Sequence, residues 1–318
     1  MRPISDMTVI QIEVTNACWL RCTNCTRFVG HHRKPYYMTL DFFRKAIESL
    51  EGFPGRIGMM GGEPTLHPQF VDLLGIMREM IPDRRKREFW TSGHKWDELK
   101  DEILATFDRD RIAYNDHTSL KGQHHPLMIA ADDVIDDKEL MWKLIDNCWI
   151  QEQWSASINP KGAFFCEVAA ARDVLYDGPG GWPIEKYWWK RTPKDFKSQM
   201  EESCTKCSAP IPLKGQSDLR GGRDGKPREY ISRTNLELLK KVNSPRVSKE
   251  EFVPFDLPYG KDDALKNSEN WNPSHFRPYI AHNPEDVMVG RQLTEVVKER
   301  AEEDVAPTAS GDEQDPNS

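Results

Sequence analysis

The first part of the chain alternates between short strand-like runs and amphipathic stretches. Residues 8–14, 56–60, 87–91 and 111–114 are short runs of apolar, β-branched or aromatic residues and predict strands. Residues 39–50, 69–80 and 96–107 place apolar side chains at helical spacing, and Thr39 stands where it can cap the first of these helices. Strands that alternate with helices predict an α/β fold built of parallel βα units.

The pattern changes in the second half. Residues 127–134 predict a fifth strand, and residues 137–147 predict a helix that runs into Cys148. Residues 154–158 and 163–166 flank the turn Asn159-Pro160-Lys161-Gly162, which predicts a β-hairpin. Further helices are expected at residues 168–175, 192–203, 235–242 and 284–302.

Composition narrows the class of protein. The chain has 318 residues, of which 38% are hydrophobic and 30% charged, and this suits one large or two small soluble domains. The net charge of -7 argues against nucleic acid as a partner, and a local basic stretch at residues 220–233 is expected to be a solvated loop. No run is long enough to span a membrane, and the first seven residues lack a signal-peptide pattern, so a cytoplasmic location is expected.

Three cysteines share one short loop after the first predicted strand, in the sequence Cys18-Trp-Leu-Arg-Cys22-Thr-Asn-Cys25. Three thiolates can hold three irons of a four-iron cluster and leave the fourth iron open. The second predicted strand is followed by Gly61-Gly62-Glu63-Pro64, so both motifs are expected at the carboxyl end of the sheet, where βα folds build their sites. A zinc site completed by His31 or His32 is the alternative for the three cysteines.

The two motifs resemble the signatures of the radical S-adenosylmethionine (SAM) enzymes, which are CxxxCxxC after the first barrel strand and a GGEP-type turn after the second. The resemblance implies a partial (β/α)6 TIM-like barrel with a SAM-binding 4Fe-4S cluster on Cys18, Cys22 and Cys25. It also implies reductive cleavage of SAM to a 5'-deoxyadenosyl radical, with the electron coming from a flavodoxin- or ferredoxin-type reductant.

The resemblance also assigns SAM-binding residues. Gly61, Gly62 and Pro64 belong to the turn that lies along the methionyl end of SAM, and Glu63 would take its ammonium group. Ser92, in the small polar run after the third strand, is a candidate for holding SAM, and Asn115 is a candidate for the ribose hydroxyls. One departure is Asn24, because most family members carry an aromatic residue at that place.

Four cysteines remain outside the loop: Cys148, Cys166, Cys204 and Cys207. Four is the number that a closed cluster needs, and seven cysteines in a cytosolic chain argue for metal binding or catalysis rather than disulfides. Their arrangement around a hairpin and a CxxC motif resembles the twitch domain, a shortened relative of the SPASM domain, and implies one auxiliary 4Fe-4S cluster. A structural zinc site on the same residues and buried unliganded cysteines, Cys148 above all, are the alternatives.

These observations predict four regions. Residues 1–147 form the radical SAM partial barrel, 148–212 a twitch-like auxiliary-cluster domain of a β-hairpin plus helix, 213–302 an extension of unknown role, and 303–318 a disordered acidic tail. A closed cluster near a substrate radical favours oxidation, and similarity to twitch-type radical SAM dehydrogenases implies a small polyol or other carbohydrate-like substrate. A redox-neutral sugar epimerase, dehydratase or decarboxylase, a peptide-modifying maturase and a non-enzymatic zinc-stabilised adaptor are the alternatives.

A polar loop between two predicted strands carries the candidates for a general base. His117, Lys121, His124 and His125 lie there, at the end of the sheet where the site is expected. Surface histidines without a catalytic role are the alternative explanation.

Overall fold

The computed structural model describes residues 1–115, 117, 123–153, 156–213, 215–217, 229–249 and 252–255. At the centre of the described residues lies a six-stranded sheet with the strand order β4-β3-β2-β1-β6-β7. Its first five strands in that order are parallel, and β7 is antiparallel to β6. Their bounds are β1 Val9–Thr15, β2 Arg56–Gly61, β3 Arg87–Thr91, β4 Ile112–Tyr114, β6 Ser157–Asn159 and β7 Gly162–Phe164.

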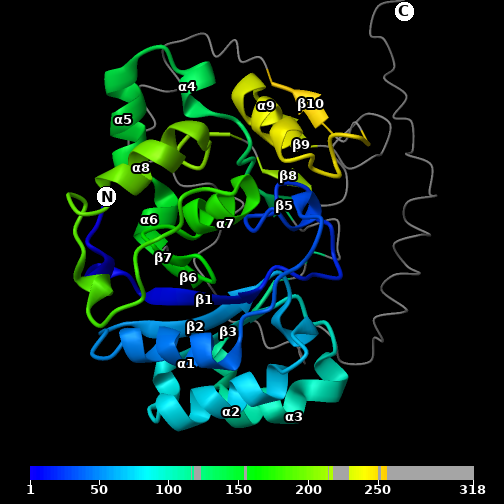
Figure 1. The fold of residues 1–318 in the computed structure, drawn as a ribbon, viewed down its shortest axis with the longest axis vertical. Coiled ribbons are helices and arrows are strands. Elements are labelled where there is room, and N and C mark those ends of the chain that lie inside the picture. The colour runs from blue at the N-terminus through cyan, green and yellow to red at the C-terminus, as the bar shows by residue number, and fades with distance from the viewer. Residues whose placement is uncertain are drawn as a thin grey trace, which may run out of the picture.

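Three helices connect the first four strands: α1 (Leu40–Ser49), α2 (Phe70–Met80) and α3 (Trp96–Thr106). They lie together on one side of β1, β2 and β3 (Figure 1). The Thr39 side chain accepts a hydrogen bond from the Phe42 N–H at 3.3 Å, so the predicted cap of α1 is confirmed. Their buried apolar residues share the main hydrophobic core with Ile10 and Ile12 of β1.

The remaining helices lie on the other side of these strands (Figure 1). They are α4 Ala131–Val134, α5 Lys138–Asp146, α6 Trp149–Gln153, α7 Glu167–Tyr176, α8 Lys197–Ser203 and α9 Arg233–Lys241. Two small strand pairs accompany them, β5 (Gln123–His124) with β8 (Gln216–Ser217) and β9 (Glu229–Ile231) with β10 (Phe252–Pro254). Single turns of 3-10 helix occur at Ile4–Asp6, Val29–His31, Pro64–Leu66, Arg84–Lys86, Arg109–Arg111, Trp188–Lys190 and Cys204–Lys206.

The α/β class with a parallel central sheet is confirmed, and so is the hairpin, whose strands are β6 and β7. The hairpin belongs to the central sheet, because β6 pairs with β1. The strand predicted at 127–134 is wrong. This apolar run makes a single bridge from Met128 to Ile231 and then enters α4, because it is buried against residues 229–249 instead of a neighbouring strand of the sheet.

Several predictions concern residues outside the described ones: the helix at 284–302, the tail at 303–318, most of the extension at 213–302, and four of the basic residues, Arg220, Arg223, Lys226 and Arg228. The predicted helix at 235–242 is confirmed as α9. None of the helices in the described part of the chain has both the length and the apolar character needed to cross a membrane.

Candidate functional site

The cysteine loop follows β1, and its residues Asn24 and Phe28 both have a positive φ. Asn24 has a φ of 55°, in the left-handed region that asparagine tolerates better than most residues, so the local backbone accounts for its place before Cys25. The Phe28 N–H closes the loop by donating to the Cys25 carbonyl at 2.9 Å. The loop therefore presents three cysteines within one compact turn.

Burial and nearby donors act in opposite directions on these thiols. Burial raises the pKa of Cys18 to about 12, and the Leu20 N–H, 3.4 Å from its sulfur, opposes this. Burial also raises the pKa of Cys25, opposed by the N–H groups of Val29 and Arg27 and by the positive charges of Arg27 and Arg246. Backbone donors and buried cations are what a metal-bound thiolate needs in place of water, so the three cysteines fit a cluster.

The glycines of the second motif pack against the chain that leads into Cys18. The Gly62 N–H donates to the Thr15 carbonyl at 2.8 Å, and the Glu63 N–H donates to the Ala17 carbonyl at 2.7 Å. A Cβ atom on Gly61 or Gly62 would collide with one of these two carbonyl oxygens. The glycines thus let the end of β2 lie directly against the residues that position the cysteine loop.

Glu63 is fully buried, and its carboxylate accepts hydrogen bonds from three neighbouring residues. The donors are the Thr65 N–H and hydroxyl, the Thr91 hydroxyl, and the Ser92 N–H and hydroxyl, at 2.7 to 3.2 Å. The expected contact with the SAM ammonium stays a prediction. In this structure the carboxylate ties the second motif to the end of β3.

Ser92 also links this arrangement to the cysteine loop. Its hydroxyl accepts a hydrogen bond from the Trp19 Nε1–H at 2.8 Å, and the Trp19 ring stacks on His94 with 5.3 Å between ring centroids. No sequence pattern pointed to Trp19 or Thr65 as members of this network, whereas Thr91 belongs to the small polar run that also contains Ser92. Asn115 follows β4, and its N–H donates to the Thr91 carbonyl at 2.9 Å, so its backbone adjoins the same end of the sheet.

The candidate bases lie in different surroundings. His117 and His124 stack with 4.5 Å between ring centroids. His125 is buried and donates through Nε2 to the Ser208 carbonyl at 2.8 Å, one residue beyond Cys207. Lys121 lies outside the described residues.

His31 is one of the two histidines that could complete a zinc site with the three loop cysteines, but its ring nitrogens bind other groups. Its Nε2 pairs with Glu229 at 2.7 Å, and its Nδ1 shares a hydrogen bond with the Ser244 hydroxyl at 2.9 Å. Burial lowers the pKa of His32, the other histidine considered, to about 4. Both nitrogens of His31 are therefore occupied by the protein.

Residues 12–114 match the family model described as the Radical SAM superfamily. This range contains the three loop cysteines and the Gly61–Pro64 turn. This segment of the chain is a radical SAM domain. No curated protein matches the chain significantly.

Two solved structures are also similar to the chain. One is described as BtrN in complex with AdoMet and 2-DOIA, with 17% identity, 63% of this chain and 88% of that chain covered, and a TM-score of 0.40. The other is described as SeMet BtrN in an open conformation, with 18% identity, coverage of 63% and 86%, and a TM-score of 0.38.

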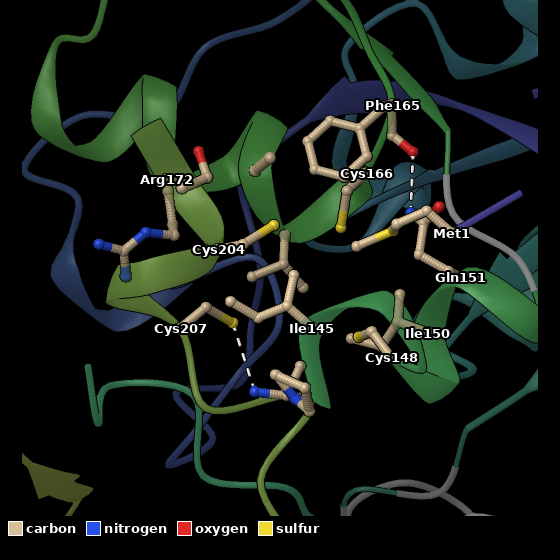
Figure 2. Close-up of a pocket in the computed structure, with 15 residues that line it drawn as sticks. Met1, Ile145, Cys148, Ile150, Gln151, Phe165, Cys166, Arg172, Cys204 and Cys207 are labelled. Carbon is tan, nitrogen blue, oxygen red and sulfur yellow. Dashed lines mark hydrogen bonds between the residues drawn. The ribbon is translucent and has the colours of Figure 1, made fainter. Parts of the chain in front are cut away.

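The chain has a second group of cysteines, which line one pocket. Cys148 lies between α5 and α6, Cys166 precedes α7, and Cys204 and Cys207 follow α8. Figure 2 shows the four side chains around the same space. Burial raises the pKa of Cys204 well above its usual value, and the charges of Cys166, Cys148 and Cys207 raise it further. The four thiols are thus near enough to act on one another.

Arg172 is the cation of this pocket. It is buried, and its Nη2 donates to the Asn235 Oδ1 at 3.0 Å, while its Nη1 has no hydrogen-bond partner among the described residues. Burial raises the pKa of Cys207, and the Arg172 charge and the N–H groups of Ala209 and Ser208 oppose it. The buried charge of Arg172, at the edge of this pocket, thus acts on Cys207.

Within the described residues, no three His, Cys, Asp or Glu side chains are arranged to hold one metal ion.

Proposed function

We propose that the chain is a radical SAM enzyme that oxidises an alcohol carbon of a small polyol or sugar-like substrate and uses an auxiliary 4Fe-4S cluster as electron acceptor. Cys148, Cys166, Cys204 and Cys207 would hold that cluster, and Cys18, Cys22 and Cys25 the SAM-binding one. The observation that carries the proposal is the pocket on which four cysteines from three parts of the chain converge, with a buried arginine in its lining.

Each cofactor supplies one half of the reaction. The first cluster with SAM would supply the radical chemistry that removes a hydrogen atom from the carbinol carbon. The auxiliary cluster would supply a one-electron acceptor for the oxidation of that carbon to a carbonyl. The hydroxyl proton goes to a base, so one hydrogen atom, one proton and one electron leave the substrate.

The protein's own residues would hold and balance these groups. Gly61, Gly62, Glu63, Pro64, Ser92 and Asn115 are the proposed SAM-binding residues. Arg172 would offset the negative charge of the four thiolates, and His117, Lys121, His124 and His125 are the candidate bases. A flavodoxin- or ferredoxin-type protein of the cytoplasm would supply electrons to the first cluster.

Iron and sulfide content with electron paramagnetic resonance (EPR) on anaerobically reconstituted protein tests the cluster assignment. We expect about eight irons in the wild type, and about four when Cys18, Cys22 and Cys25 are all changed to alanine. A Cys204→Ala/Cys207→Ala variant should also keep about four, with the EPR signal of the other cluster. A wild type that holds about four irons, all lost with the three loop cysteines, would remove the auxiliary cluster from the proposal.

The oxidation level of the product tests the reaction. The same wild-type preparation, incubated anaerobically with SAM and a panel of polyols and aminosugars, should form 5'-deoxyadenosine together with a ketone or aldehyde. The Cys204→Ala/Cys207→Ala variant should still cleave SAM but form no carbonyl product. A product at the oxidation level of its substrate would point to a redox-neutral reaction instead.

A further inference from the structure

The segment 229–249, which comprises β9, α9 and the turn after α9, lies far from both cysteine groups in the sequence but contacts both in the structure. It is the yellow part of Figure 1, beside α4 and above α7. We call this segment the brace. Its contacts are made by buried polar side chains. Burial of a polar group costs free energy unless the group is hydrogen-bonded, so the partners of these side chains indicate their role.

Glu229 makes the first contact with the cysteine loop. Its side chain is 2% exposed, and Oε1 accepts from the Asn24 N–H at 2.8 Å and from Arg246 Nη1 at 2.5 Å. Its Oε2 pairs with His31 Nε2 at 2.7 Å. One carboxylate thus binds Asn24, which precedes Cys25, together with His31 and the Arg246 side chain of the brace itself.

Arg246 makes the second contact with the loop. Its Nη2 donates to the carbonyls of Arg21 and Cys22 at 2.7 and 2.9 Å. A Cβ atom on Gly30 would collide with the Arg246 guanidinium, so this glycine leaves the space that the arginine fills. Buried backbone carbonyls need donors, and here the brace supplies them to the loop between its first and second cysteines.

Asn235 makes the contact with the other cysteine group. It is fully buried, and its Nδ2 donates at 3.0 Å to the carbonyl of Lys206, which lies between Cys204 and Cys207. Its Oδ1 accepts from Arg172 Nη2 at 3.0 Å. Asn235 therefore fixes both the CxxC turn and Arg172, the cation of the pocket.

We propose that the brace positions the two cluster-binding groups relative to each other, with Glu229 and Arg246 as positioning residues for the loop and Asn235 as the positioning residue for the CxxC turn. The inference rests on the proposed function, because it takes both groups as cluster ligands. In this role the brace holds the two cluster-binding groups at a fixed separation, and its residues do not themselves take part in the reaction.

Three single variants of the full-length reconstituted protein test the brace. Arg246→Met removes the donors to the loop, Asn235→Ala removes the contact with the CxxC turn, and Lys240→Ala is the control. Lys240 lies on α9, is half exposed and pairs only with Glu237 among the contacts that the structure describes. The readouts are the EPR spectrum and midpoint potential of each cluster and the hydrogen exchange of residues 18–31 and 204–207.

We expect a separate effect at each end. Arg246→Met should change the EPR spectrum and potential of the SAM-binding cluster and speed exchange in residues 18–31 by about tenfold. Asn235→Ala should do the same at the auxiliary cluster and residues 204–207, and Lys240→Ala should change neither. Arg246→Lys, which keeps the charge but loses the two-pronged geometry, should give a smaller shift and serves in place of Arg246→Met if that variant is insoluble.

Two results would overturn the brace. One is the absence of any change at either group in Arg246→Met and Asn235→Ala, and the other is an equal change at both groups in each variant, which would mean general loosening of the fold. A wild type without the auxiliary cluster would instead contradict the proposed function, and the exchange of residues 204–207 would still test the contact of Asn235.

Discussion

At the scale of single residues, two buried carboxylates are stabilised in different ways. Glu63 is held by hydroxyl and N–H donors from Thr65, Thr91 and Ser92, all of them neutral. Glu229 is held by two basic side chains, His31 and Arg246, together with one backbone N–H. A carboxylate that depends on basic partners should make the stability of the protein depend on pH.

Glu229 therefore gives a prediction for stability against pH. Although burial opposes ionisation, His31 and Arg246 lower the pKa of Glu229 from 4.5 to about 2. Because the folded-state pKa lies below the unfolded value, its stabilisation is complete above about pH 4.5 and is lost as the pH falls towards 2. We expect Glu229→Gln to lower the free energy of unfolding by about 3 kcal/mol at pH 7.

Urea denaturation of wild type and Glu229→Gln between pH 7 and pH 2.5 measures this effect. The difference between the two proteins should be constant down to about pH 4.5 and shrink below it. Glu79→Gln, which removes an exposed carboxylate paired with Arg44, is the control and should have little effect. A difference that stays unchanged at low pH would mean that Glu229 acts through its shape and not its charge.

The residues that could be predicted from the sequence are those that belong to local motifs. Cys18, Cys22, Cys25 and the Gly61–Pro64 turn form compact motifs, so their spacing alone indicates a shared function. Arg172 and Arg246 show no such signal, because an arginine in a charged stretch resembles a solvated surface residue. Only their burial beside the cysteine groups reveals what they do.

At the scale of elements, periodicity predicts β1 to β4 and α1 to α3 because each of these segments packs against its neighbours in sequence. The apolar run at 127–134 resembles a strand because burial and strand pairing select the same residue types. It is buried against the brace, which lies about 100 residues later in the chain, and no local pattern reports such a partner.

The hairpin gives a prediction at this scale, at the glycine that begins its second strand. Gly162 has a φ of 124°, and a Cβ atom there would come within 2.6 Å of the Trp182 carbonyl oxygen. Gly162→Ala should lower the free energy of unfolding by about 2 kcal/mol and reduce the auxiliary iron, because Cys166 follows the second strand of the hairpin.

Gly75 is the matched control. It lies inside α2, and a Cβ atom there would meet nothing within 4 Å. Gly75→Ala should raise the free energy of unfolding by about 0.5 to 1 kcal/mol, because alanine is the better helix former. Chemical denaturation together with iron analysis measures both variants. Destabilisation by Gly75→Ala, or full auxiliary iron in Gly162→Ala, would contradict the account of the hairpin.

At the scale of the whole molecule, the sequence predicts a boundary between residues 147 and 148, and this boundary stays a prediction. The structure adds that β6 pairs with β1, so the hairpin whose second strand leads to Cys166 continues the sheet beside the strand that leads to Cys18. Such pairing could not be predicted, because the register between distant strands depends on contacts that no single segment encodes.

A buried ion triad spans the same junction. Arg27, two residues after Cys25, binds the carboxylate of Glu13 on β1 and pairs through Nη2 with Glu167 Oε1 at 3.0 Å. Glu167 follows Cys166 directly, and the Arg27 charge interacts with both Cys25 and Cys166. The charge of Arg27 therefore acts on one cysteine of each group, and two buried carboxylates pair with it.

Removal of this charge should affect both groups together, unlike the separate effects expected in the brace. Arg27→Gln leaves two buried carboxylates without their cation and should cost about 3 to 5 kcal/mol of stability. A nearby positive charge favours the more negative, reduced form of a cluster, so both midpoint potentials should become more negative. Arg27→Lys keeps the charge and should shift them less, as a potentiometric EPR titration would measure. A shift confined to the cluster on Cys18, Cys22 and Cys25 would mean that the triad serves only the radical SAM site.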